Sequence, residues 1–180
     1  MTHTIFKSIK LINPATNFNQ KVNVVIQNET IISISKDLNL KKFNKDKQTI
    51  IYDCEGLTMS PGIFDMRVNI GKTENLKFTQ ITAAESGITS MAILPNQTPK
   101  LNNPSIIDHI KRQSEDINLP KVMVYGAATK DLNGLEMSEI GLMSEMGAIG
   151  FTNGNKSIKN SLVMRRLMSY ATMINRPIIQ

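Results

Sequence analysis

Short apolar runs alternate with longer amphipathic segments over the last two thirds of this sequence. The runs are typical of buried strands, and the segments between them have the length and spacing of helices. Strands that alternate with helices predict right-handed βαβ units and therefore a parallel sheet. We expect strands starting at Ile63 and covering 88–94, 122–125 and 148–151, with a fifth beginning at Pro177.

Helices are expected between these strands, at 74–86, 104–116 and 137–146, and over an apolar stripe from Ile158 to Ile174. Two of them run into glycine, a residue that commonly ends helices, at Gly87 and Gly147. A closed barrel of eight such units needs roughly 250 residues, so this part of the chain is enough for about half of one.

The first part of the chain has a strand pattern without helices. Residues 4–12 predict a strand, and the alternation around residues 22–26 followed by an apolar run at 31–34 predicts a hairpin. Another strand is expected at 49–53. We therefore divide the chain into a small β unit at residues 1–58 and an α/β unit at residues 59–180.

The strand that follows Pro61-Gly62 carries an unusual polar face. Side chains alternate along a strand, so Asp65, Arg67 and Asn69 are expected on one face and Phe64, Met66 and Val68 on the other. Three polar groups on one face of a buried strand are costly unless they line a site. We expect a candidate site here, with a buried ion pair between Asp65 and Arg67.

The segment from Pro61-Gly62 to Asp65 resembles the first barrel strand of the dihydroorotase family of amidohydrolases. The resemblance implies the N-terminal part of a β-sandwich followed by the first half of a (β/α)8 metallo-hydrolase barrel, cut off about half way. In that family two zinc-binding histidines and then a substrate-binding arginine follow the aspartate. Arg67, Asn69 and Gly71 occupy these positions here, as in a bacterial subgroup that lacks the metal ligands.

Two further motifs resemble the same family. Phe151-Thr152-Asn153-Gly154 matches a segment whose aspartate can bridge the metals, and Asn153 replaces that aspartate. By itself Asn153-Gly154 is an ordinary turn signal. Pro95-Asn96-Gln97-Thr98-Pro99 matches a loop whose asparagine binds the substrate carboxylate, which makes Asn96 a candidate substrate-binding residue. The alternative is a rigid loop that two prolines keep for its shape.

A zinc site is poorly supported by the residue types. The sequence has only two histidines, His3 in the N-terminal tail and His109 on the expected solvent face of a helix. Arg67 has no lone pair to give and repels a cation, at roughly 4 kcal/mol per unit-charge pair 4 Å apart in a dielectric near 20. We therefore expect no metal, no cofactor and no catalytic residue, although the resemblance implies zinc in active relatives.

Composition and sequence patterns limit where the protein can be located and what it can bind. Cys54 is the single cysteine, no apolar run reaches membrane-spanning length, and no signal peptide begins the sequence. A cytoplasmic protein that does not enter a membrane is expected. The net charge of +6 comes from scattered lysines rather than from a basic patch, so nucleic-acid binding is not expected either.

Three functions remain open at this point. The resemblance implies a dihydroorotase-like protein of de novo pyrimidine (UMP) biosynthesis that is non-catalytic and acts with aspartate carbamoyltransferase. The alternatives are an active zinc dihydroorotase, a cyclic amide hydrolase that interconverts carbamoyl aspartate and dihydroorotate, and a decayed fragment without function. We expect an oligomer or a truncated fragment.

Overall fold

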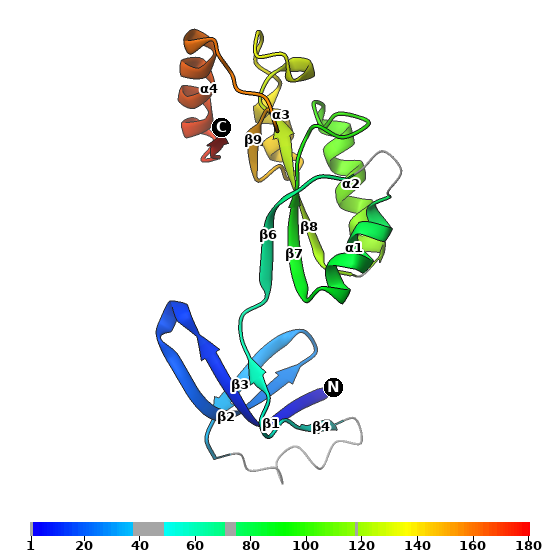
Figure 1. The fold of residues 1–180 in the computed structure, drawn as a ribbon, viewed down its shortest axis with the longest axis vertical. Coiled ribbons are helices and arrows are strands. Elements are labelled where there is room, and N and C mark those ends of the chain that lie inside the picture. The colour runs from blue at the N-terminus through cyan, green and yellow to red at the C-terminus, as the bar shows by residue number, and fades with distance from the viewer. Residues whose placement is uncertain (1, 38–48, 71–74, 118) are drawn as a thin grey trace. The chain divides into compact units, whose positions relative to one another are not determined.

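A computed structural model describes residues 2–37, 49–70, 75–117 and 119–180 (Figure 1). The chain divides into two compact units, Met1–Pro61 and Gly62–Gln180. Gly71, one of the positions singled out in the sequence, lies outside the described residues.

The first unit is a five-stranded sheet. The order is β3-β2-β1-β4, with β5 also paired to β1; β2 runs antiparallel to β1 and β3, whereas β4 and β5 run parallel to β1. The predicted hairpin is confirmed, with Asn28 in a left-handed conformation at φ 53°. The strands are β1 (His3–Asn13), β2 (Phe18–Gln27), β3 (Thr30–Ser35), β4 (Thr49–Asp53) and β5 (Thr58–Met59), with a 3-10 turn at Pro14–Thr16.

This sheet buries a small apolar cluster of its own. Val24 is fully buried, and Cys54 packs into the same cluster. His3 is also buried, at the start of β1, where it pairs with Gln27 and Thr49. The expectation that His3 lies in a free tail is therefore wrong, because strand pairing begins at the third residue.

The second unit is a parallel sheet of five strands in the sequential order β10-β9-β8-β7-β6. The predicted alternation of strands and helices is confirmed. The elements are β6 (Ile63–Val68), α1 (Leu76–Glu85), β7 (Ile88–Ile93), α2 (Pro104–Ile117), β8 (Lys121–Ala127), a 3-10 turn (Lys130–Leu132), α3 (Ile140–Glu145), β9 (Gly150–Thr152), α4 (Ser161–Met173) and β10 (Ile178–Ile179).

Local signals set the helix ends. Asn75 caps α1 by accepting a hydrogen bond from the Phe78 backbone at 2.8 Å, and Asn160 caps α4 in the same way. Helix α3 is shorter than predicted because Met137 forms an isolated β-bridge with Thr129 instead of a helical turn. None of the helices in the described ranges has the length and apolar character needed to cross a membrane.

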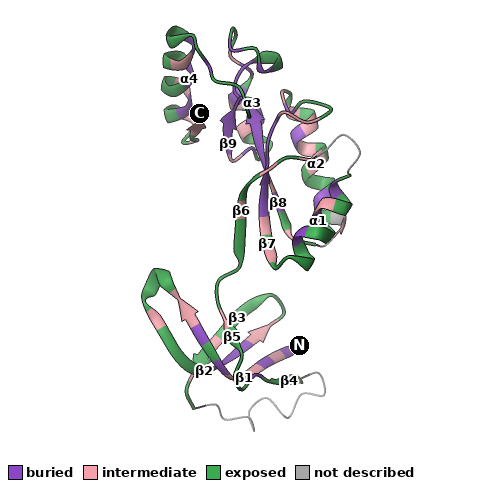
Figure 2. Ribbon diagram, in the orientation of Figure 1, coloured by how far each residue is buried: buried purple, intermediate pink, exposed green. Residues whose placement is uncertain are grey.

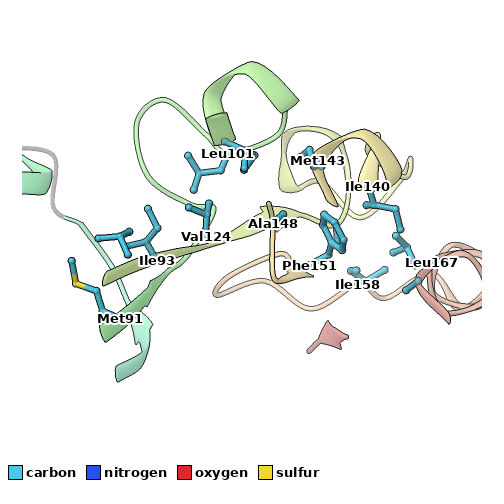
Figure 3. Close-up of a cluster of buried hydrophobic side chains, with 14 of the residues drawn as sticks. Met91, Ile93, Leu101, Val124, Ile140, Met143, Ala148, Phe151, Ile158 and Leu167 are labelled. Atoms are coloured by element: carbon cyan, nitrogen blue, oxygen red, sulfur yellow. The ribbon is translucent and has the colours of Figure 1, made fainter. Parts of the chain in front are cut away.

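The helices of the second unit contribute to one hydrophobic core on one face of the sheet (Figure 3). Met91 and Ile93 of β7 and Val124 of β8 belong to this core, together with Leu167 of α4. The alternate residues Ala92, Leu94 and Tyr125 form a separate apolar cluster. Alternate residues of the strands therefore belong to different clusters, as the sequence predicts. Buried residues are concentrated in β8 and β9 (Figure 2).

Strand β6 is the exception to this burial. It lies at the edge of the sheet, where Ile63 is 61% and Met66 is 66% exposed. The expectation of a buried strand is wrong, because β7 is the one strand among the described residues that pairs with it. Position 62 requires glycine because its backbone lies close to Thr89: a Cβ there would be 1.9 Å from the Thr89 hydroxyl oxygen.

Candidate functional site

The main candidate site is a cavity of about 490 Å³ in the second unit. Strands β6 to β10 are parallel, so their carboxyl ends share one edge, and the lining residues come from these ends and from the segment that follows β9. Active sites of (β/α)8 barrels form at this edge. The lining residues are Met66, Arg67, Leu94, Tyr125, Thr152, Gly154, Asn155, Lys156, Ser157, Ile179 and Gln180.

Arg67 brings a positive charge to this cavity. Its guanidinium group donates a hydrogen bond from Nη2 to Oδ1 of Asn155 at 3.1 Å, across 88 residues of sequence. The side chain is exposed, as expected for the edge strand β6. The two segments that resemble metal-binding motifs are thus joined by a hydrogen bond between an arginine and an amide.

Asp65 does not form the predicted ion pair with Arg67. Its Oδ1 accepts a hydrogen bond from the Arg67 backbone N–H at 3.0 Å, while the guanidinium group turns to Asn155. The prediction of a buried pair is wrong because β6 is an edge strand, so Arg67 can stay in water and needs no counterion. Asn69 follows β6, is exposed, and does not line the cavity.

Asn153 lies between two residues of the cavity wall in sequence, Thr152 and Gly154, and is buried and bound to Thr129. Its Oδ1 accepts from the Thr129 backbone N–H at 3.1 Å, and its Nδ2 lies 2.8 Å from the Thr129 hydroxyl. That hydroxyl also accepts from the backbone N–H of Gly134 at 2.9 Å. Asn153 is only 2% exposed and joins the end of β9 to the segment after β8.

Asn96, the candidate substrate-binding residue, packs against Gly154. A Cβ on Gly154 would lie 2.6 Å from Oδ1 of Asn96, so the loop after β7 and the turn after β9 touch. Oδ1 of Asn96 is buried and has no hydrogen-bond partner among the described residues. The loop contains a cis peptide bond between Thr98 and Pro99. Asn96 does not itself line the cavity that Arg67 lines.

The residues present do not fit zinc, the metal that the resemblance implies for active relatives. Zinc takes cysteine, histidine, aspartate or glutamate ligands. Among the described residues no three such side chains lie together in a way that could hold a metal ion. The groups that line the cavity are instead cations, hydroxyls and amides, with Arg67 where the resemblance places the first imidazole. His109 is exposed on α2, as predicted.

Several site residues are not singled out by the sequence. Lys156 adds a second cation to the cavity, and Tyr125 contributes a phenol whose pKa is raised by burial of the side chain. Asn155 and Thr129 matter only through contacts with Arg67 and Asn153. The position of Lys156 soon after the Asn153-Gly154 turn is the one signal that could have pointed to it.

Comparisons with known proteins agree with this geometry. No family model matches the chain. The dihydroorotase of Syntrophus aciditrophicus is 27% identical over 180 residues, which cover 97% of this chain and 41% of that protein. The dihydroorotase of Caldicellulosiruptor saccharolyticus is 29% identical with the same coverage. The solved L-hydantoinase (dihydropyrimidinase) of Arthrobacter aurescens has a TM-score of 0.76 at 19% identity, over 99% of this chain and 40% of that one.

The fold and the place of the cavity define a class of protein. A β unit followed by parallel βα units with a cavity at the carboxyl edge has the fold of the N-terminal portion of a (β/α)8 barrel protein, as predicted. Within that fold the chain is similar to dihydroorotases over nearly its whole length, and the predicted resemblance to that family is confirmed. It spans about two fifths of the length of the dihydroorotases that it matches.

Proposed function

We propose that this chain is a non-catalytic dihydroorotase-like protein of de novo pyrimidine biosynthesis that acts in the cytoplasm through contact with aspartate carbamoyltransferase. The relatives named dihydroorotase support the pathway. The chemistry of the cavity supports the loss of catalysis. The partner is supported by the resemblance to non-catalytic members of the family.

The observation that carries this proposal is the Arg67 side chain at the cavity. The position that the resemblance assigns to a zinc-binding imidazole presents a guanidinium group with no lone pair. A dication placed beside it meets a like charge in addition to missing a ligand. Asn69 and Asn153 remove two further ligand positions, and the Asn153 amide is already bound to Thr129.

Metal content and turnover test the loss of catalysis. Purified chain incubated with zinc and then desalted is expected to carry substoichiometric zinc and to leave carbamoyl aspartate and dihydroorotate unchanged. The matched control is the double variant Arg67→His, Asn69→His, which restores two imidazoles and is expected to hold more zinc. Stoichiometric zinc together with turnover in the unchanged chain would show that the proposal is wrong.

Association tests the partner. Size-exclusion chromatography of the chain mixed with aspartate carbamoyltransferase from the same organism is expected to give a shared peak of larger size. An unrelated protein of similar mass serves as the control and is expected to elute separately. Separate elution of both pure proteins, over a range of concentrations, would leave the decayed fragment as the better description.

An active zinc dihydroorotase is the second candidate. The observation that favours it is the similarity to dihydroorotases over 97% of this chain. The zinc and turnover experiment decides between the two candidates.

A further inference from the structure

We propose that the cavity at the carboxyl edge of the second unit binds a small molecule through an oxyanion, a carboxylate or a phosphate group, held by Arg67 and Lys156. This inference goes beyond the proposed function and does not depend on the partner. It concerns the kind of ligand that the cavity binds in place of a metal ion.

The first argument is the number of donors that remain available. A guanidinium group has five N–H donors in a rigid fork. Arg67 uses one of them for Asn155, and its remaining side-chain donors have no hydrogen-bond partner within the described ranges. The bond to Asn155 orients the guanidinium group, and the other donors remain available to a ligand in the cavity. Arginine in such an arrangement suits planar or tetrahedral oxyanions.

The second argument is the charge of the lining. Among the residues that the structure describes, Arg67 and Lys156 are the charged residues of the cavity wall, and no aspartate or glutamate of these ranges lines it. Neither cation takes part in the ion pairs found among the described residues, which lie elsewhere. The nearest acid along β6, Asp65, binds the Arg67 backbone and is not part of the wall. Two cations that have no counterion among the described residues create a positive potential that favours an anion.

The third argument is the remainder of the wall. Leu94, Tyr125 and Ile179 supply apolar surface, and Thr152 and Ser157 supply hydroxyl groups. A volume of about 490 Å³ is within the usual range for a small-molecule site. Apolar walls with a few polar groups are typical of pockets that bind an organic body and orient it by its charged end.

This site uses other residues than the one expected at Asn96, although Gly154 of the cavity wall contacts Asn96. The resemblance assigns the substrate carboxylate to Asn96 together with an arginine at the position of Gly71. Asn96 does not line the cavity, and the cations of the cavity are at other positions. The proposed oxyanion site therefore uses residues that the resemblance assigns to no carboxylate.

Calorimetric titration of the metal-free 180-residue chain tests the proposal. The probes are inorganic phosphate and succinate, each at low and at high sodium chloride, up to about 10 mM. We expect saturable binding of at least one probe that weakens with salt. Arg67→Gln and Lys156→Gln are each expected to raise Kd by about tenfold, because each removes a charge-assisted contact.

Lys159→Gln is the matched control, since Lys159 is an exposed lysine three residues further along that does not line the cavity. It is expected to leave Kd within about twofold, as distant surface changes usually do. Circular dichroism of each variant confirms that it is folded. Binding of phosphate but not succinate, or the reverse, supports the site and identifies the source of the oxyanion.

Two results would overturn the inference: no saturable binding of either probe, or binding that Arg67→Gln and Lys156→Gln leave unchanged. Both are independent of the partner experiment. Failure to associate with aspartate carbamoyltransferase overturns the proposed function without affecting the oxyanion site. A titration without saturable binding overturns the oxyanion site without affecting the proposed function.

Discussion

The side-chain amide of Asn153 is bound at both ends by Thr129. Oδ1 of Asn153 accepts from the Thr129 backbone N–H at 3.1 Å, and Nδ2 lies 2.8 Å from the Thr129 hydroxyl. Thr129 is fully buried and Asn153 is 2% exposed. The Asn153 amide supplies both an acceptor and a donor to Thr129, and the Thr129 hydroxyl also lies 3.1 Å from Oδ1 of Asn153.

Asn153→Ala is expected to destabilise the chain by about 1–3 kcal/mol, because it leaves buried polar groups of Thr129 without partners. Urea unfolding measures the difference. Asn155→Ala is the matched control: Asn155 is exposed, and its loss is expected to change the free energy of unfolding by less than about 0.5 kcal/mol. Equal effects at the two positions would show that the Thr129 contact does not stabilise the fold.

Gly154→Ala is expected to be more harmful than Gly56→Ala. Both glycines have positive φ, 63° at Gly154 and 83° at Gly56, so each alanine costs about 1–2 kcal/mol of backbone strain. A Cβ at Gly154 also meets Asn96 at 2.6 Å, whereas nothing lies within 4 Å of one at Gly56. Chemical denaturation should give the larger loss for Gly154→Ala, and equal losses would mean that Asn96 moves aside freely.

Leu167→Ala is expected to cost about 2–5 kcal/mol, as large-to-small changes in a core do. Leu167 is fully buried on the inner face of α4. Leu162 of the same helix is 53% exposed, and Leu162→Ala serves as the control, with an expected change below about 0.5 kcal/mol. Thermal unfolding distinguishes the two variants. A similar fall in Tm for both would contradict the packing of α4 described above.

Tyr125 is expected to make the fold sensitive to alkali. Burial raises the pKa of Tyr125 above its ordinary value of 10.0. The folded chain therefore keeps this proton when the unfolded chain has begun to lose it. The resulting stability is complete below the unfolded pKa and is lost as the pH rises through the folded one. Urea unfolding at a series of alkaline pH values should show that the free energy of unfolding falls less steeply with pH for Tyr125→Phe than for the unchanged chain. Identical declines would contradict this role of Tyr125.

Much of the fold follows from local sequence patterns. The order of strands and helices after Ile63 is readable because the apolar spacing changes between the periods of strand and helix. The hairpin at Asn28 and the helix end at Gly87 follow from single residues that tolerate positive φ. These signals act over a few residues, so they can be recognised in the sequence without knowledge of the fold.

The details of the candidate site depend on contacts between distant segments, and they could not be read in this way. Arg67 meets Asn155 across 88 residues, so no local pattern reveals that this contact replaces the predicted pair with Asp65. Thr129 becomes important only because the segment after β8 lies beside Asn153. The exposure of β6 is also hard to predict, because a polar face with Asp65 and Arg67 suits a strand that lines a site as well as an exposed edge strand.

The sequential order of the parallel sheet bears on how the chain folds as it is synthesised. Among the described residues, strands that are neighbours in the sheet from β6 to β10 are also successive strands along the chain. Once β7 has left the ribosome it can dock on β6, and each later βα unit can add to a sheet that is already formed. Growth by neighbouring units keeps loop closures short, which favours fast, vectorial folding from the N-terminal side.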